Sequence, residues 1–312
     1  MLPLNGRRKL SLVSYAHGTT SYRPDVPSTM QDDTMSAPGI AYAAAGFVSS
    51  SPDYLGLGSG PGTHPWMDIS SETTASVDML KAARAVVHRH GRAVNRSVYV
   101  TGFSQGASAA LGLARALQHG ADPRSRVAAI APLSGGYAFG RAELPAMLRG
   151  ELDPRISVAC TSYLLVARNR LYHFYDSLRE LFRKRYAGKV GKLFSGSVPG
   201  PQMLGSLPAD IHQLLNTKGL ALLGHPTGRF RASLREIDRV CSGWRPDAPT
   251  RLYYVPGDEQ AANANTTACR QQFHGAARSV ALPDYRYGGS RHVGTVITGV
   301  AATLRWFDRL SR

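Results

Sequence analysis

Residues 97–117 read SVYVTGFSQGASAALGLARAL, and this stretch decides the fold. Its first five residues are β-branched, aromatic or small, which is typical of a buried strand. From Ala107 to Leu117 alanine and leucine dominate, which is typical of a helix. The link between the two, GFSQG, has a glycine two residues before and two residues after Ser104, as a sharp strand-to-helix turn requires.

Ser104 is therefore interpreted as an exposed nucleophile, against the alternative of an idle serine in a glycine-rich turn. The five-residue pattern alone would be weak, because the chain contains 32 glycines. Its position between a strand and a helix strengthens it. In this setting the backbone N–H of Gln105, at the N-terminus of the following helix, is expected to face negative charge that develops on a substrate oxygen.

A serine hydroxyl needs a base to take its proton, and the base needs a third group to orient it. His292 is the candidate base, because it follows the loop YGGSR at 287–291 and precedes the last expected helix. Asp258 and Glu259 both follow the expected strand RLYYV at 251–255, at the strand end that favours catalytic groups. Asp258 is the preferred acid, and Glu259 is the alternative.

A second oxyanion donor is expected after the first strand. His17-Gly18-Thr19 follows the run Leu10–Tyr15, and a glycine there lets the backbone approach a substrate. Gly18 or Thr19 would supply the N–H. His17 lies upstream of the nucleophile, so it is not the expected base.

Short strand-like runs alternate with helical ones, which predicts an α/β fold with a mostly parallel sheet and flanking helices. Together with the turn at Ser104 and the order Ser104, Asp258, His292, this predicts the α/β-hydrolase type. Strands are expected at 10–15, 46–50, 97–101, 126–132, 251–255 and about 279–282, and helices at 71–90, 107–117 and 293–310. Between 137 and 245 the strand pattern stops. That segment is predicted to be an inserted helical cap, interrupted at 197–201 and 224–228, within a core formed by 1–136 and 246–312.

The N-terminus carries a turn signal. Asn5-Gly6 is a hairpin dipeptide just before the first strand, so the chain is expected to open inside or just after a β-hairpin. No signal-peptide pattern is visible, because no apolar run follows the charged first residues. The apolar stretch 40–48 is too short to cross a bilayer.

The chain is strongly basic, with a net charge of +16. Residues 137–245 hold 17 Lys/Arg and 8 Asp/Glu, a net of +9, and the densest run, Arg183-Lys184-Arg185, is expected on an amphipathic helix. No helix-turn-helix, zinc-finger or single-strand-binding signature accompanies it, so no nucleic-acid partner is expected. The charge is interpreted as a basic surface that contacts water or an anionic interface such as lipid.

Three cysteines, Cys160, Cys241 and Cys269, form no CxxC pair, so they are not expected to bind a metal. Two states of the cysteines remain open: one disulfide, for instance Cys241–Cys269, or three buried free thiols.

With these residues in place, the chain resembles the secretory-lipase family of α/β-hydrolases, which includes fungal lipase A-like enzymes and bacterial relatives. The stretches that carry the resemblance are YAHGT (15–19), PDYLGLG (52–58), HPW (64–66), GFSQG (102–106) and HVG (292–294). Asp258-Glu259 followed by Asn265-Thr266 also looks like the family's acid loop.

The resemblance implies hydrolysis of small-molecule or lipid esters through an acyl-enzyme, without a metal or organic cofactor, and a helical cap over an acyl-binding pocket. It implies that Asp53 and His64 shape the rim of the site or support its loops. The resemblance suggests a secreted protein, but two features depart from the family: its members usually have considerable sequence before the oxyanion strand and usually enter the secretory route, and this chain shows neither feature. Without the earlier strands, the strand at 46–50 is expected to be a sheet edge.

Two other classes of function remain open. A peptidase or acylaminoacyl-type hydrolase would use the same triad, and should place charged groups to hold a peptide terminus. A non-catalytic basic binding protein would need no complete set of Ser104, Asp258 and His292. The presence of all three in the order typical of this fold favours an enzyme.

Overall fold

The computed structural model describes residues 1–29 and 33–312. In these residues a six-stranded, wholly parallel sheet has the order β2-β1-β3-β4-β5-β6. Its strands are β1 (Lys9–Ala16), β2 (Val48–Ser50), β3 (Ala93–Phe103), β4 (Arg126–Leu133), β5 (Thr250–Tyr254) and β6 (Ala277–Ala281). The predicted α/β class, with a parallel sheet and flanking helices, is confirmed.

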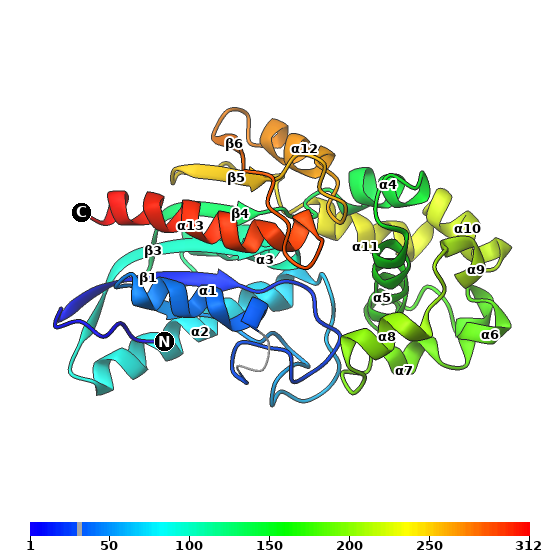
Figure 1. Cartoon of the computed structure of the whole chain (residues 1–312), viewed down its shortest axis with the longest axis horizontal. Coiled ribbons are helices and arrows are strands. Elements are labelled where there is room, and N and C mark those ends of the chain that lie inside the picture. Colours follow the sequence, from blue (N-terminus) through cyan, green and yellow to red (C-terminus); the bar gives the residue numbers. More distant parts are fainter. Residues whose placement is uncertain (30–32) are drawn as a thin grey trace.

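Helices cover both faces of the sheet (Figure 1). They are α1 (Asp33–Ala44) and α13 (Arg291–Ser311) on one face, and α2 (Ile69–Arg89), α3 (Gln105–Gln118) and α12 (Ala264–Gln272) on the other. In β3, Val98 and Val100 pack toward α2 and α3, whereas Tyr99 packs toward α13. Burial on both faces explains why the run SVYVT is hydrophobic without a break.

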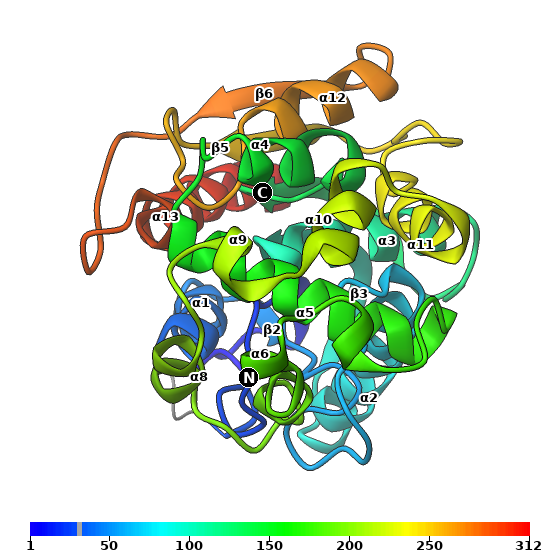
Figure 2. The same cartoon turned by 90° about the vertical axis from the view of Figure 1, so that its right-hand side faces the viewer.

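The segment between β4 and β5 contains only helices. They are η1 (Phe139–Glu143, a π-helix), α4 (Leu144–Leu148), α5 (Pro154–Tyr172), η2 (Leu178–Glu180, a 3₁₀-helix), α6 (Lys184–Ala187), α7 (Val190–Leu193), α8 (Gly200–Ser206), α9 (Ile211–Leu214), α10 (Thr217–Gly224) and α11 (Gly228–Asp238). Figures 1 and 2 show them gathered beyond the carboxyl ends of the strands. They enclose a hydrophobic cluster of their own, which Trp66 and Met67 enter from outside the segment.

One helix expected in this segment is far shorter than predicted. The run Arg183-Lys184-Arg185 begins a helix of only four residues, α6, and not a continuous amphipathic helix. Arg183 is extended, and its N–H donates to Leu214 O, 3.0 Å away, while its guanidinium donates to His212 O and Leu215 O. Contacts with a distant part of the chain therefore override the local helical pattern.

The predicted hairpin at the N-terminus is also wrong for the part of the chain that the structure describes. No strand precedes β1 there, and Asn5 accepts a hydrogen bond from Arg92 instead of joining two strands. Met1 exchanges two backbone hydrogen bonds with Ser49 of β2, of 2.7 and 3.0 Å. As predicted, the strand within 46–50 is a sheet edge, and Met1 covers part of it.

Cys241 and Cys269 form a disulfide that ties the chain beyond α11 to α12. Cys160 is a free thiol in α5, and burial raises its pKa to about 12, so it is protonated at neutral pH. No helix among the described residues has both the length and the apolar character needed to cross a membrane.

Candidate active site

Ser104 lies at the tip of a tight turn between β3 and α3. Its backbone has a positive φ of 56°, a conformation that a non-glycine residue adopts only where the surroundings enforce it. Gly102 and Gly106 make the turn feasible. A Cβ on Gly102 would lie 2.1 Å from the Gly106 carbonyl oxygen, and one on Gly106 would lie 2.1 Å from the Ala16 carbonyl oxygen. The glycines of GFSQG are therefore required by close backbone packing.

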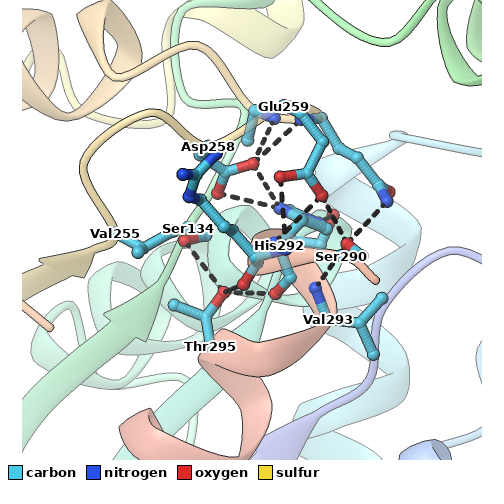
Figure 3. A network of polar contacts seen from close by, with 12 residues as sticks. Ser134, Val255, Asp258, Glu259, Ser290, His292, Val293 and Thr295 are labelled. Carbon is cyan, nitrogen blue, oxygen red and sulfur yellow. Dashed lines mark hydrogen bonds and ion pairs between the residues drawn. The ribbon is translucent and has the colours of Figure 1, made fainter. Parts of the chain in front are cut away.

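The structure brings Ser104, His292 and Asp258 into one hydrogen-bonded chain. The Oγ atom of Ser104 lies 2.9 Å from His292 Nε2, and His292 Nδ1 lies 3.0 and 2.9 Å from the two carboxylate oxygens of Asp258. Ser104 directly follows β3, Asp258 lies in the loop after β5, and His292 lies in the first turn of α13. Figure 3 shows Asp258 facing the imidazole of His292.

The Asp258 carboxylate is held by the backbone as well as by His292. Its Oδ1 accepts the backbone N–H groups of Gln260 and Ala261, both at 2.9 Å. Burial alone would raise the pKa of this carboxyl. The charge and hydrogen bond of His292, with the two N–H groups, outweigh burial and lower its pKa below the usual value. Asp258 is therefore ionised at neutral pH.

His292 is buried, and burial alone would lower the pKa of its imidazole. The charge and hydrogen bond of Asp258 outweigh this, and the more distant Glu143 and Glu259 add to the effect, so its pKa is raised above 6.5. Because Asp258 accepts at Nδ1, that nitrogen carries the proton of the neutral ring. Nε2 then presents its lone pair to the Ser104 hydroxyl.

Glu259, the alternative acid in the sequence prediction, contacts the backbone of His292 and not its ring. Its carboxylate accepts the N–H groups of Arg291 and His292, each at 3.2 Å, and the hydroxyl of Ser290. These groups form the N-terminus of α13, where a negative charge is favourable. Figure 3 shows the two neighbouring carboxylates in these different positions.

The all-helical segment between β4 and β5 reaches the acid loop through Glu143. This buried carboxyl accepts the backbone N–H of Ala262 at 2.9 Å and the side-chain amide of Asn265 at 2.5 Å. Asn265 in turn accepts the N–H of Ala138, at 2.9 Å, through its Oδ1. Burial raises the pKa of Glu143 to about 7. No sequence pattern distinguishes Glu143, because it lies within an irregular helical stretch.

The predicted oxyanion residues follow the carboxyl ends of two neighbouring strands, β1 and β3. Gln105 begins α3, and within residues 1–29 and 33–312 no acceptor is bonded to its backbone N–H. Gly18 lies against Phe103, where a Cβ would be 2.9 Å from the ring. Thr19 is held by its hydroxyl, which accepts the indole N–H of Trp66 at 3.0 Å. The HPW motif thus supports the predicted donor loop.

Asp53 and His64 support loops near the site. The Asp53 carboxylate accepts the N–H of Ser28 at 3.0 Å. His64 donates from Nδ1 to the carbonyl of Leu55 at 3.1 Å, and its Nε2 accepts from the Gln105 side chain at 2.8 Å. Among the described residues, no group of three or more His, Cys, Asp and Glu side chains is arranged to hold a metal ion.

The sheet order, the elbow and the helical segment together define the class of the fold: it is the α/β-hydrolase fold. A Legionella pneumophila protein classed provisionally as a hydrolase is 23% identical, aligns over 100% of this chain and 82% of its own, and gives a TM-score of 0.86. The rice cell wall degrading esterase LipA of Xanthomonas oryzae is 23% identical, over 96% and 82%, with a TM-score of 0.85.

Candida antarctica lipase A shares the fold at greater distance, with 13% identity over 90% of this chain and 65% of its own, and a TM-score of 0.62. The resemblance to lipase A-like proteins inferred from the sequence is thus confirmed at the level of the fold. No protein-family model matches the chain, and no curated protein matches it by sequence.

Proposed function

We propose that the protein is a serine hydrolase that cleaves carboxylic esters through an acyl-enzyme. The observation that carries the proposal is the chain from Ser104 Oγ to His292 Nε2 and from His292 Nδ1 to Asp258, with each contact near 2.9 Å. Nucleophile, base and orienting acid within hydrogen-bond reach are what acyl transfer needs. The fold shared with esterases and a lipase supports the choice of esters.

In acylation, Ser104 Oγ attacks the ester carbonyl carbon while His292 Nε2 takes the hydroxyl proton. The carbonyl oxygen becomes an oxyanion, which the N–H of Gln105 and an N–H of Gly18 or Thr19 would stabilise. The carbon–oxygen bond to the alcohol then breaks, and the imidazolium of His292 returns its proton to the leaving oxygen. The acyl group remains on Ser104.

In deacylation, water attacks the acyl carbon and gives a proton to His292 Nε2. The bond to Ser104 breaks, Oγ regains the proton, and the carboxylic acid leaves. Asp258 stays ionised throughout and stabilises the imidazolium that forms in each half-reaction. Because the base must be neutral and its pKa is raised above 6.5, activity should rise with pH through and above that value.

Turnover of short-chain p-nitrophenyl esters tests the proposal. Ser104→Ala should abolish turnover, and a fluorophosphonate should label Ser104 in the unaltered protein, as peptide mass spectrometry would show. Ser311→Ala is the matched control, because Ser311 is exposed near the end of α13 and should leave rate and labelling unchanged. Full activity in the Ser104→Ala variant, or labelling at another serine, would refute the assignment.

The acyl group and the leaving group need a second measurement. A series of acyl chain lengths, each with and without a lipid interface, separates an esterase from a lipase. A lipase should gain rate at the interface, whereas an esterase should not. A matched anilide for each ester measures the peptidase alternative, and faster cleavage of anilides than of esters would replace our choice of substrate.

A further inference from the structure

The side chain of Gln105, the residue after the nucleophile, lies in a buried polar cluster that the proposed mechanism does not use. Its amide nitrogen lies 2.6 Å from Glu72 Oε1 and 2.8 Å from His64 Nε2. All three side chains are at most 3% exposed. Glu72 lies in the first turn of α2, His64 in the HPW loop and Gln105 at the start of α3. Glu72 and His64 therefore hold the Gln105 amide from two sides.

The tautomer of His64 sets the direction of these bonds. Its Nδ1 faces the carbonyl oxygen of Leu55, which can only accept, so Nδ1 carries the ring proton. The Nε2 lone pair therefore accepts one N–H of the Gln105 amide. The other N–H of that amide donates to Glu72 Oε1. Burial lowers the pKa of His64 to about 3, which is consistent with a neutral ring.

Two buried oxygens in this cluster are left without a partner. They are Glu72 Oε2 and Gln105 Oε1, which have no hydrogen bond within the part of the chain that the structure describes. If Glu72 were ionised, both oxygens would be acceptors, and neither could satisfy the other. If Glu72 carried a proton on Oε2, one would be a donor and the other an acceptor. Only the protonated form makes the two side chains complementary.

The surroundings of Glu72 also favour the neutral acid. Gln105 hydrogen-bonds to Glu72, and His64 contacts Gln105 from its other side. The ionisable groups that interact with Glu72 are Asp68, Arg168, Glu236, Tyr54 and Tyr163. Burial is the largest cause, and it raises the pKa of Glu72 to about 8. Arg168 opposes this only in part, because it pairs with Asp68 and Glu236.

We propose that Glu72 is a neutral carboxylic acid that pairs with the Gln105 amide through two hydrogen bonds, and so positions the Gln105 backbone N–H as an oxyanion donor. The inference rests on the proposed function for the role of that N–H. Glu72 would be a positioning residue, since it acts through Gln105 and would touch no substrate. The pairing also assigns a role to His64 of the HPW motif, because its Nε2 accepts the second N–H of the Gln105 amide.

The decisive comparison is Glu72→Gln with Glu72→Leu. Glutamine has the shape of the neutral acid, and its amide could still donate to Gln105 Oε1 and accept from Gln105 Nε2, so kcat should stay within about threefold. Leucine removes both bonds, and kcat should fall about 10- to 100-fold with little change in KM, less than the 10²–10³-fold loss of a donor removed outright. Asp78→Asn is the matched control, because Asp78 is an exposed carboxylate of α2.

The pH dependence provides a second readout. Above about pH 8, ionisation of Glu72 places a charge and a mismatched acceptor behind the oxyanion donor, so the unaltered enzyme should lose kcat there. Glu72→Gln has nothing to ionise at this position and should keep its rate. In urea unfolding, the unaltered protein should lose stability between about pH 4.5 and 8, because the unfolded chain releases this proton and the folded protein keeps it. The Glu72→Gln variant should lose less stability over the same pH range.

The outcomes separate this proposal from the proposed function. If Glu72→Gln falls as far as Glu72→Leu, the charge is needed and the neutral pair is wrong. If Glu72→Leu keeps full kcat, Glu72 does not position the donor. If the unaltered protein turns over no ester, the proposed function fails. The unfolding series still decides the protonation of Glu72 in that case, because it needs no substrate, and equal pH slopes in both proteins would overturn the pairing.

Discussion

Replacing Asp258 by asparagine changes one atom of the side chain and should disable the base. In the unaltered protein Asp258 Oδ1 accepts two backbone N–H groups, and Oδ2 lies 2.9 Å from His292 Nδ1. An asparagine must keep its oxygen on the backbone donors, so its NH₂ group faces His292. The ring then turns Nδ1 into the acceptor and carries its proton on Nε2. That proton points at Ser104, which can no longer be deprotonated.

The size of the loss follows from this tautomer. A triad whose histidine is fixed in the wrong tautomer loses about 10⁴-fold in kcat, or about 5 kcal/mol of transition-state stabilisation. The pH profile should change too. In the unaltered enzyme Asp258 raises the pKa of His292 above 6.5, so the acid limb of kcat/KM lies above that value. Without the carboxylate, residual activity should have its acid limb at lower pH.

The assay is p-nitrophenyl ester turnover from pH 5 to 9, with thermal unfolding of each variant to exclude misfolding. Glu259→Gln is the matched control: it removes the neighbouring carboxylate but leaves the contact between His292 and Asp258. Its kcat should fall by no more than about tenfold, because Glu259 acts on the N-terminus of α13 and not on the imidazole. A nearly inactive Glu259→Gln beside an active Asp258→Asn would reverse the choice of acid.

Two further predictions concern stability. Replacing Cys241 and Cys269 by alanine opens a loop with a sequence separation of 28, which should lower the unfolding free energy by about 3–4 kcal/mol in urea; a loss below about 1 kcal/mol would contradict a constraining role. Glu143→Gln removes a carboxyl whose pKa burial raises from 4.5 to about 7. Because the folded protein keeps a proton that the unfolded chain releases in that window, the unaltered protein should lose stability as pH rises. The unfolding free energy of the variant should fall less steeply with pH, by up to about 1.4 kcal/mol per pH unit. Equal pH slopes of the unfolding free energy in the two proteins would refute this prediction.

The core of the fold could be predicted because its signals are local. The strand and helix on either side of GFSQG need no information from elsewhere, and the glycines before and after Ser104 are required by backbone contacts within β3, α3 and the end of β1. The choice of Asp258 over Glu259 rested on order along the chain alone. The structure shows that the two carboxylates point to different parts of His292, its ring and its backbone.

What the sequence could not reveal depends on long-range contacts. Arg183 leaves a helical pattern because carbonyls about 30 residues away accept from it. Glu143 contacts Ala262 only when the helical segment folds back on the loop after β5. Glu72 did leave a signal that could have been used. It lies four residues before Ser76 and eight before Leu80, on the buried side of α2, where a lone acid is unexpected.

The buried carboxyl groups around Ser104 differ in what each of them accepts, and this decides where negative charge resides. Asp258 faces the imidazole and two N–H groups, and its pKa is lowered. Glu143 and Glu72 accept only from uncharged amide groups, and burial raises their pKa values to about 7 and 8. A second fixed charge beside His292 would raise the pKa of the ring further and reduce the fraction of neutral base. Glu143 acts on His292 when it is ionised, and a pKa of about 7 leaves it only partly ionised at neutral pH, so the fixed charge at the ring is mainly that of Asp258. In the proposed reaction that charge would stabilise the imidazolium of His292.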